Sequence, residues 1–527
     1  MTSESTEENP LEILDRLNQV GIALSAENDI DKLLEMILEN TQDIIHADGG
    51  TLYTLTKNQT LKFSIIRNKS LNIKMGGVGE IQIPFPDIPL YQEGVANHSA
   101  IASHCALNKQ SVNIEDAYLE KGFDFSGAKA FDEKTGYRTQ SVLAVPLINH
   151  EGNVLGVLQL INCLDKKNTS IKFTNFAQKL AESLTSQAAI SLQNTILINQ
   201  LKGLFEGLTN LINTAIDEKS PYTGGHCLRV PELTLMLAEA ASEEQDGPLA
   251  DFKMDDKDRY ELKIAGMLHD CGKITTPVHV VDKATKLETI FDRITLIETR
   301  AEALRNQLTV ECMRSTLGQP MSKTQFEAIL TQQLSELDDD LSFLQKCNIG
   351  SERMRPEDID RVKSIGNRTW LNAKGEKQSF LSEDEILNLT IIAGTLTPAE
   401  RAIINNHITS TIKLLGQIEW PDHLKNVTEY AGGHHERMDG KGYPKGLTKD
   451  QMSIQARIMG IADIFEALTA ADRPYKKGMP LSQSLSIMTR MRNEGHIDPD
   501  LFDIFIKHRI YQDYAQRYLK PEQIDIE

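Results

Sequence analysis

The chain has 527 residues and a formal net charge of -19 at pH 7, and its length predicts roughly two to four domains. The excess of acidic residues argues against a broad electrostatic grip on polymeric nucleic acid or on an anionic membrane surface. No apolar run approaches the roughly 20 residues of a membrane helix, and residues 1–11, which we expect to be disordered, have no secretory pattern. These features predict a cytoplasmic protein without membrane insertion.

The cysteines are scattered along the sequence and show no CxxC spacing. A disulfide framework or a zinc ribbon is therefore not expected. We predict instead that the thiols are reduced and mostly buried. The cysteines are Cys105, Cys163, Cys227, Cys271, Cys312 and Cys347.

The first third of the chain changes from helical to strand-like periodicity. Residues 11–47 place leucine and isoleucine at helical spacing. Alternating patterns follow at 51–55 and 61–65, and a clearer pair of strands at 141–147 and 154–160 flanks a Glu-Gly-Asn turn. A helix, two hairpins and a closing helix predict an α+β sensor module.

Two stretches of this module have a recognisable sequence. Gly-Tyr-Arg-Thr-Gln-Ser-Val-Leu-Ala-Val-Pro-Leu occupies 136–147, and Gly-Val-Leu-Gln-Leu-Ile-Asn occupies 156–162. They resemble the corresponding stretches of GAF domains. The resemblance implies a GAF sensor domain over residues 12–195.

The ligand of such a domain is left open by the sequence. GAF domains that bind cyclic nucleotides often carry Asn-Lys, then Phe, then an Asp-Glu pair. Asn162 and Phe173 match, but Cys163 replaces the lysine and Asn-Phe-Ala at 175–177 stands where the acidic pair would fall. An unknown small ligand and a ligand-free dimerisation role are therefore both open.

A nearly continuous helical pattern without proline extends over residues 176–216. A stripe of this kind is best buried against a copy of itself, which predicts a connecting helix that forms a parallel two-helix stalk in a homodimer. The alternative is a helix that packs against its own domain. The apolar positions are Leu180, Leu184, Ile190, Leu192, Ile196, Ile198, Leu201, Leu204 and Leu208.

Residues 284–390 form a second region of helical spacing, which becomes polar and irregular at 366–372. Two long helices in a hairpin fit its first part. The segment has no group of histidines, cysteines or paired carboxylates at metal-ligand spacing. We interpret it as an inserted helical hairpin that serves contact or regulation.

The residues that point to chemistry lie on both sides of this segment. His-Asp-Cys-Gly-Lys occupies 269–273, and His-His-Glu-Arg-Met-Asp-Gly-Lys-Gly-Tyr-Pro occupies 434–444. Imidazole and carboxylate are the usual mixed ligands of divalent first-row metals. Asp463 lies in an otherwise apolar helical run at 458–465, where a carboxylate is costly unless it is paired or bound to metal. Together these stretches predict one polynuclear metal site.

The candidate metal ligands form an ordered series in which each member lies on or beside a helix with an inward apolar face. Ligands that converge from several helices can hold two metal ions bridged by Asp270. His279 and His423 are expected to be core histidines instead. The candidate ligands are His226, His269, Asp270, His407, His434, His435 and Asp463.

Three further stretches accompany these motifs, namely Arg-Ile at 457–458, Asp-Arg-Pro-Tyr-Lys at 472–476 and Gly-His-Ile-Asp-Pro at 495–499. Together they resemble an HD-GYP domain, which we expect at 217–520 with 284–390 inserted. HD-GYP domains are all-α, metal-dependent phosphohydrolases that cleave cyclic di-GMP. The resemblance implies the ligand series above, two divalent ions with iron or manganese favoured over zinc, and hydrolysis of cyclic di-GMP to linear pGpG, to GMP, or to both.

The chain departs from the HD-GYP pattern in four places. Tyr222 stands where members with three metals supply a glutamate, which favours two metals here. The insertion replaces the short connection between the His-Asp helix and the next ligand helix. Glu466 stands where an aspartate is more usual, and Pro231 is expected to kink the first ligand helix.

Catalytic roles are expected for Lys273 and Asp270. Two divalent ions would clamp the phosphodiester oxygens and make a water molecule more acidic. Lys273, about one helical turn beyond His269, can place a positive charge beside the transferred phosphoryl group. Hydrolysis of another cyclic dinucleotide, 3'3'-cGAMP, is an alternative, and so is a catalytically slow receptor or adaptor for such a ligand.

Substrate contacts are expected from two segments. Arg473 and Lys476 have a spacing suited to gripping the phosphates or guanine edges of the ligand, with a solvated basic surface pair as the alternative. Gly440, Gly442 and Pro444 are expected to hold a turn that permits close backbone approach. Tyr443 is expected to pack on or hydrogen bond to the partner surface, and Gly442, Tyr443 and Pro444 are the candidate substrate-binding residues of this turn.

Overall fold

The computed structural model divides into two compact units, Met1–Phe205 and Glu206–Glu527. One helix, α5 (Asn175–Lys219), begins in the first unit and ends in the second. Of the segment expected to be disordered, residues 1–9 lie outside the described residues, and helix α1 begins at Pro10. None of the described helices is both long and apolar enough to cross a bilayer. The structure describes residues 10–79, 81–219, 225–316, 323–350, 353–471 and 478–526.

An antiparallel sheet with the strand order β3-β2-β1-β9-β8-β7 forms the centre of the N-terminal unit. Two short strands extend it, because β10 pairs with β9 and β4 with β2; β5 and β6 form a separate hairpin. The strands are β1 (Ala47–Leu55), β2 (Thr60–Asn68), β3 (Ile73–Gly76), β4 (Ile88–Pro89), β5 (Tyr91–Gln92), β6 (Val95–Ala96), β7 (Val112–Ile114), β8 (Val142–Ile148), β9 (Val154–Leu164) and β10 (Ser170–Ile171).

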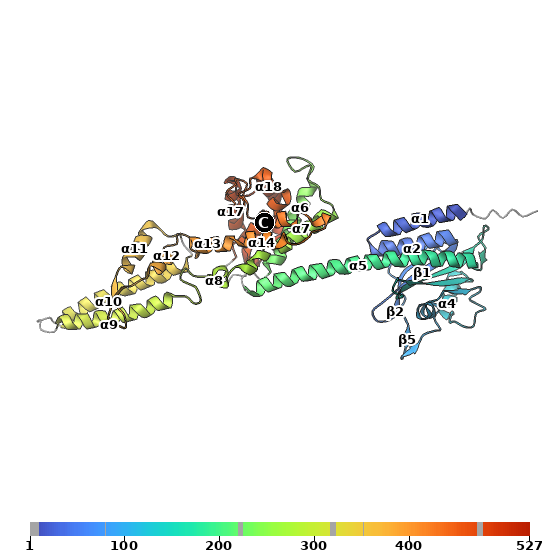
Figure 1. The fold of residues 1–527 in the computed structure, drawn as a ribbon, viewed down its shortest axis with the longest axis horizontal. Helices are drawn as coiled ribbons and strands as arrows, with labels where there is room; N and C mark the ends of the chain where they lie inside the picture. The colour runs from blue at the N-terminus through green and yellow to red at the C-terminus, as the bar shows by residue number, and fades with distance from the viewer. Residues whose placement is uncertain are drawn as a thin grey trace, which may run out of the picture. The chain divides into compact units, whose positions relative to one another are not determined.

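Each face of this sheet has its own hydrophobic core, as the two-residue period of the strands requires. In β8, Leu143 and Val145 point into one core, whereas Val142 and Ala144 point into the other. Helices α1 (Pro10–Ala26), α2 (Ile30–Ile45) and the first part of α5 cover the first face (Figure 1). Helices α3 (Ile101–Asn108) and α4 (Ser126–Thr135) contribute to the second core. The predicted α+β module is confirmed.

The apolar residues of helix α5 are buried in its first half and exposed further along. Its first half buries Leu180, Leu184 and Leu192 in the core of the N-terminal unit, which matches the predicted alternative of packing against the same domain. Further along, a second group of leucines and isoleucines remains exposed. These residues are Leu197, Ile198, Leu201, Leu204, Leu208, Leu211 and Ile212.

The C-terminal unit is largely helical. Helix α6 packs against α7, α16 and α18, and α15 packs against α7, α14 and α16. Helix α6 continues through Pro231, against which the backbone of Gly266 in α7 packs closely. Outside the insertion, the α-helices are α6 (His226–Glu243), α7 (Asp256–Leu268), α8 (Val278–Val281), α13 (Pro398–Asn405), α14 (His407–Leu415), α15 (Val427–Gly433), α16 (Ile454–Thr469), α17 (Leu481–Asn493), α18 (Pro499–Lys507) and α19 (Ile510–Tyr518).

The inserted segment folds around a hydrophobic core of its own. Helices α9 (Ile294–Thr316) and α10 (Lys323–Ile349) pack side by side as a hairpin (Figure 1). Helix α11 (Pro356–Gly366), strands β11 (Thr369–Leu371) and β12 (Lys377–Ser379), and helix α12 (Glu383–Leu389) follow. Part of the stretch expected to be irregular is thus a strand, β11, which pairs with β12.

A buried lysine closes the base of the insertion. The Lys283 ammonium donates hydrogen bonds to both carboxylate oxygens of Glu400 at 2.8 Å and to the side-chain oxygen of Asn388 at 2.9 Å. The hydroxyl of Thr395 donates to the Lys283 carbonyl at 2.9 Å. The residues on either side of the insertion are therefore tied directly to each other.

The two histidines expected in the core are exposed, so that prediction was wrong. His279 lies in the four-residue helix α8, which buries only Val280, and His423 lies in a 3-10 turn that buries only Leu424. Such short segments turn one side chain inward and leave the others in solvent. The prediction for the cysteines is confirmed, since all are free and Cys347 is the one that is not fully buried.

Candidate metal centre

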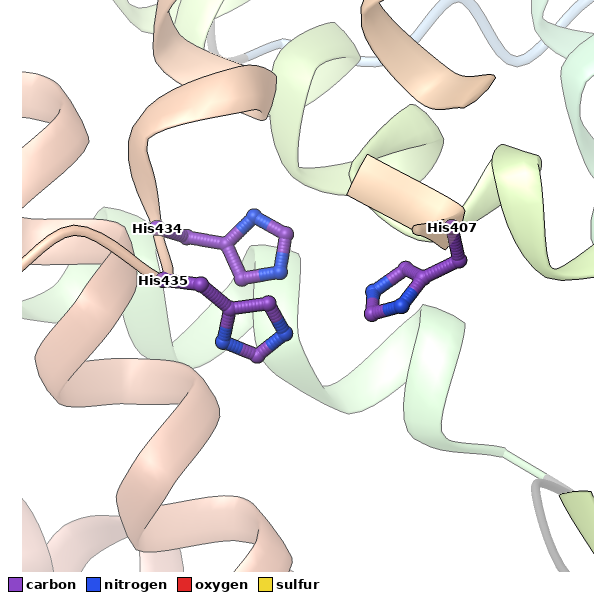
Figure 2. Close-up of side chains that lie close together, drawn as sticks. All are labelled: His407, His434 and His435. Atoms are coloured by element: carbon purple, nitrogen blue, oxygen red, sulfur yellow. The ribbon is translucent and has the colours of Figure 1, made fainter. Parts of the chain in front are cut away.

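All the histidines of the predicted series lie at helix ends. His226 is the first residue of α6, and His269 directly follows the last residue of α7. His407 lies where α13 gives way to α14, and His434 and His435 directly follow α15. Side chains at these positions meet because their helices pack around one another. Figure 2 shows the rings of His407, His434 and His435 facing a common space.

Backbone carbonyls orient several of these rings. In each case the Nδ1 atom lies within hydrogen-bond distance of the carbonyl oxygen three residues earlier. A carbonyl oxygen can only accept, so Nδ1 carries the proton and Nε2 keeps a free lone pair. The pairs are His269 with Gly266 at 2.6 Å, His407 with Ile404 at 2.5 Å, and His434 with Ala431 at 2.7 Å.

The side chains form two clusters of candidate metal ligands. Within each cluster the donor atoms lie within 4.8 Å of one another. Asp270 connects the clusters, since its Oδ2 atom lies 3.3 Å from the Nε2 atom of His226 and its Oδ1 atom lies 3.2 Å from that of His407. One cluster is His226, His269 and Asp270, and the other is His407, His434 and His435.

Asp463 lies between the clusters in a similar way. This residue comes from the middle of α16 and is almost fully buried. Its Oδ1 atom lies 3.3 Å from the Nε2 atom of His226, and its Oδ2 atom lies 4.0 Å from the Nδ1 atom of His435. The carboxylate that the sequence marked as costly therefore has imidazoles on both sides.

Several buried atoms of the site have no hydrogen-bond partner. They are the Nε2 atoms of His407 and His434 and the Oδ1 atom of Asp270. With its proton on Nδ1, His407 turns a lone pair toward the carboxylate oxygen of Asp270. Buried acceptors that face each other are unfavourable unless a cation lies between them. The donor set therefore fits metal ions.

Burial keeps most of these imidazoles neutral. Burial lowers the pKa of His269, and burial together with the neighbouring His435 holds the pKa of His434 well below its ordinary value. Burial also lowers the pKa of His435 to about 4. Neutral imidazoles have the lone pair that a metal ion needs.

In His226 and in the two aspartates, by contrast, the surroundings favour the charged form. Burial alone would lower the pKa of His226, but hydrogen bonds to Asp270, Asp463 and Glu466 raise it well above its ordinary value. Burial alone would raise the pKa of both aspartates. The charge of Lys273 lowers the pKa of Asp270 well below the usual range, and the hydrogen bond from His226 does so for Asp463. Both carboxyl groups are anions.

Lys273 reaches the site through a close backbone contact. Its ammonium donates a hydrogen bond to Oδ2 of Asp270 at 2.5 Å. The 3-10 turn Cys271–Thr275 that carries it lies against α14, and a Cβ atom on Gly272 would come within 2.0 Å of the His407 carbonyl oxygen. The Gly272 amide donates to the Thr411 hydroxyl at 2.9 Å. Gly272 thus lets the turn approach His407.

Family comparisons match both units of the chain. The GAF domain family matches residues 29–192. Two HD domain families match the C-terminal unit, one at residues 223–330 and the other at residues 383–501. The chain carries a GAF domain followed by an HD domain. The predicted multidomain architecture, with an α+β GAF domain and a largely helical HD region, is confirmed.

Curated relatives match shorter parts of the chain. A 3'3'-cGAMP-specific phosphodiesterase of Vibrio cholerae is 38% identical over 123 residues, which cover 23% of this chain and 27% of that protein. A cyclic di-GMP phosphodiesterase of Pseudomonas aeruginosa is 36% identical over 124 residues, which cover 24% and 28%. A cGMP-specific 3',5'-cyclic phosphodiesterase of Drosophila melanogaster is 30% identical over 207 residues, which cover 35% and 17%. The chain thus spans slightly more than a quarter of each of these two bacterial relatives and less than a fifth of the fly relative.

The loop that follows the paired histidines in the HD domain is held by glycines and by Glu436. Gly440 has a φ of 74°, and a Cβ atom on Gly442 would come within 2.4 Å of the backbone of Glu436. The Glu436 carboxylate accepts hydrogen bonds from the amides of Lys445 at 2.7 Å and Leu447 at 2.8 Å. Gly442 thus permits close packing within the loop itself, and the predicted approach of this backbone to a substrate stays a prediction.

Tyr443 lies against the site. Its ring packs on that of His435, with centroids 4.9 Å apart and planes 32° from parallel, and its amide donates to the His435 carbonyl at 3.2 Å. The following bond to Pro444 is cis. Arg473 and Lys476, the other predicted substrate-binding residues, lie outside the described residues, as does Tyr222.

Two residues of the HD domain that contact the site were not assigned a role from the sequence. The Nδ1 atom of His226 lies 2.5 Å from an oxygen of Glu466, and Arg229 donates to the other Glu466 oxygen at 2.8 Å. A signal for them exists in the sequence, since Glu466 lies one helical turn beyond Asp463 and Arg229 one turn beyond His226.

Proposed function

We propose that the chain is a metal-dependent phosphodiesterase of the HD-GYP type that hydrolyses a cyclic dinucleotide. The observation that carries this proposal is the pair of ligand clusters joined by Asp270. Support also comes from the HD domain and from the bacterial relatives, which are named for cyclic di-GMP and for 3'3'-cGAMP. Cyclic di-GMP and 3'3'-cGAMP are the candidate substrates, and linear pGpG and GMP are the candidate products.

The donor atoms suit two divalent ions, one at each cluster. Imidazole and carboxylate are the usual mixed ligands of divalent first-row metals, and the resemblance to HD-GYP domains favours iron or manganese among them. Bound ions would polarise phosphoryl oxygens and make a water molecule acidic enough to act as a nucleophile at neutral pH. In this proposal Asp270 and Asp463, which lie beside histidines of both clusters, would supply carboxylate oxygens, and the histidines would supply neutral nitrogen atoms.

A few residues beside the metal ligands would bind the substrate or keep the ligands in place. Lys273 adds a positive charge directly beside Asp270, where it can offset negative charge that develops on the phosphoryl group. Tyr443 fixes the His435 ring by packing on it. Arg473 and Lys476 are proposed to hold the phosphates or guanine edges of the dinucleotide.

One assay tests the function directly. Protein loaded with Fe(II) or Mn(II) under anaerobic reducing conditions is incubated with cyclic di-GMP or with 3'3'-cGAMP, and linear dinucleotide and GMP are quantified by chromatography. We expect hydrolysis of at least one substrate, and the ratio of the two rates identifies the preferred one. Tight binding of both compounds without turnover would replace the enzyme proposal with a receptor.

The exposed part of α5 supports a second copy of the chain as a partner. Leu197, Leu201, Leu204, Leu208 and Leu211 are spaced alternately by four and three residues and are 42 to 65% exposed. This is the heptad spacing that pairs helices in a coiled coil. We propose a homodimer in which the GAF domain regulates the HD domain through this helix.

A double substitution tests the dimer. Leu204→Asp with Leu208→Asp is expected to convert a dimer into a monomer in light scattering coupled to size exclusion, since each leucine contributes about 2 kcal/mol when buried. Asn199→Asp is the matched control, because it adds a charge to an exposed position of the same helix outside the stripe and should leave the dimer intact. A monomeric wild type would contradict the proposal.

A further inference from the structure

His226 is oriented differently from His269, His407 and His434. Those three follow the C-terminal turn of a helix, where backbone carbonyls can accept a hydrogen bond from the imidazole. His226 instead begins α6. The unpaired backbone groups at a helix start are amides, which cannot accept a proton from Nδ1. The ring of His226 therefore needs an acceptor from elsewhere in the chain.

Glu466 supplies that acceptor from α16. One of its carboxylate oxygens lies 2.5 Å from Nδ1 of His226, and the side chain is 1% exposed. A carboxylate accepts only, so Nδ1 carries a proton, and a metal ion bound at this site would take the place of the proton on Nε2. That Nε2 atom lies 3.3 Å from both Asp270 and Asp463. Glu466 thus fixes the ring so that Nε2, and not Nδ1, lies next to the two aspartates.

Arg229 holds Glu466 in turn. Its Nε and Nη2 atoms lie 2.8 and 2.6 Å from Oε1 of Glu466, which leaves Oε2 for His226. The paired charges offset the cost of burying the carboxylate. Helix α6 presents His226 and Arg229 one turn apart, and α16 presents Asp463 and Glu466 one turn apart. The two helices are joined by these side chains at the edge of the first cluster.

We infer that Glu466 and Arg229 form a positioning pair that decides metal affinity at the cluster of His226, His269 and Asp270, and not at the cluster of His407, His434 and His435. This inference rests on the proposed function, because it assigns a cation to Nε2 of His226. Partners that orient a ligating histidine typically contribute about 10- to 100-fold to metal affinity. The second cluster has backbone acceptors for His407 and His434 and does not contact Glu466.

Titration of the metal-free full chain with Mn(II) tests the inference, with free Mn(II) measured by its electron paramagnetic resonance signal. We expect two bound ions in the wild type. In Glu466→Ala one dissociation constant should rise by about 10- to 100-fold, while the other changes by less than about twofold. For Glu466→Gln, the affected dissociation constant should lie between those of the wild type and Glu466→Ala, because the amide oxygen still accepts from Nδ1. For Arg229→Met, the same constant should rise, but by less than in Glu466→Ala.

Glu261→Gln is the matched control. Glu261 is 4% exposed, lies on α7 and accepts hydrogen bonds from the amide and side chain of Asn426, away from the imidazoles. It should bind both ions as the wild type does. Two unchanged constants in folded Glu466→Ala and Glu466→Gln, or an equal loss at both positions, would overturn the positioning pair alone. A wild type that binds no Mn(II) and no Fe(II) would overturn the proposed function and the pair together.

Discussion

Replacing Asp270 with asparagine is expected to lower turnover of the cyclic dinucleotide by about 10³-fold or more. The Asp270 carboxylate contacts both clusters and Lys273, and asparagine has nearly the same shape without the charge. Loss of an ion that supplies several kcal/mol of charge stabilisation corresponds to such a factor. Steady-state hydrolysis measures the loss, and metal analysis should show fewer than two ions per chain.

Asp498→Asn controls for the loss of a buried carboxylate in the same domain. Asp498 is fully buried and paired with Lys449 and Arg457, and not with the histidines of the site. This variant is expected to keep its two ions and its turnover per folded molecule, although its thermal stability should fall. Wild-type metal content and turnover in Asp270→Asn would refute the proposed role of this aspartate.

The positions of the candidate ligands could be predicted because each signal is local in sequence. His269 with Asp270 and His434 with His435 follow apolar runs that must end inside the protein, and Asp463 interrupts another such run. The orientation of the rings could not be predicted in this way. The Arg229 contact with Glu466 joins residues 237 positions apart, and such a contact depends on how α6 and α16 pack.

Helix α5 and the insertion show a second limit of periodic patterns. The spacing of the leucines in α5 predicts a helix, but it does not distinguish Leu184, which packs on the sheet, from Leu204, which is exposed. Strand β12, Lys377–Ser379, is polar and fully exposed. It lacks the apolar alternation by which a strand is predicted, and only its pairing with β11 defines it.

Glu400→Gln is expected to destabilise the base of the insertion by about 3 kcal/mol, because removal of one partner of a buried ion pair leaves the other charge uncompensated. The Lys283 side chain is 0% exposed and its ammonium would keep only Asn388 and the neutral amide. Hydrogen exchange followed by mass spectrometry should show faster exchange around both residues at pH 7. Glu376→Gln, which alters an exposed carboxylate near the β11–β12 turn, should exchange as the wild type does.

The difference should also depend on pH. Burial would raise the pKa of Glu400, but Lys283 and the Thr397 amide and hydroxyl hold it below the ordinary value. A carboxyl group with a lowered pKa in the folded state contributes stability that is fully present above its unfolded pKa of about 4.3 and is lost as the pH falls through the folded value. The gap between wild type and Glu400→Gln should therefore narrow below about pH 4.3. A gap that stays constant down to pH 3 would show that the charge of Glu400 does not stabilise this junction.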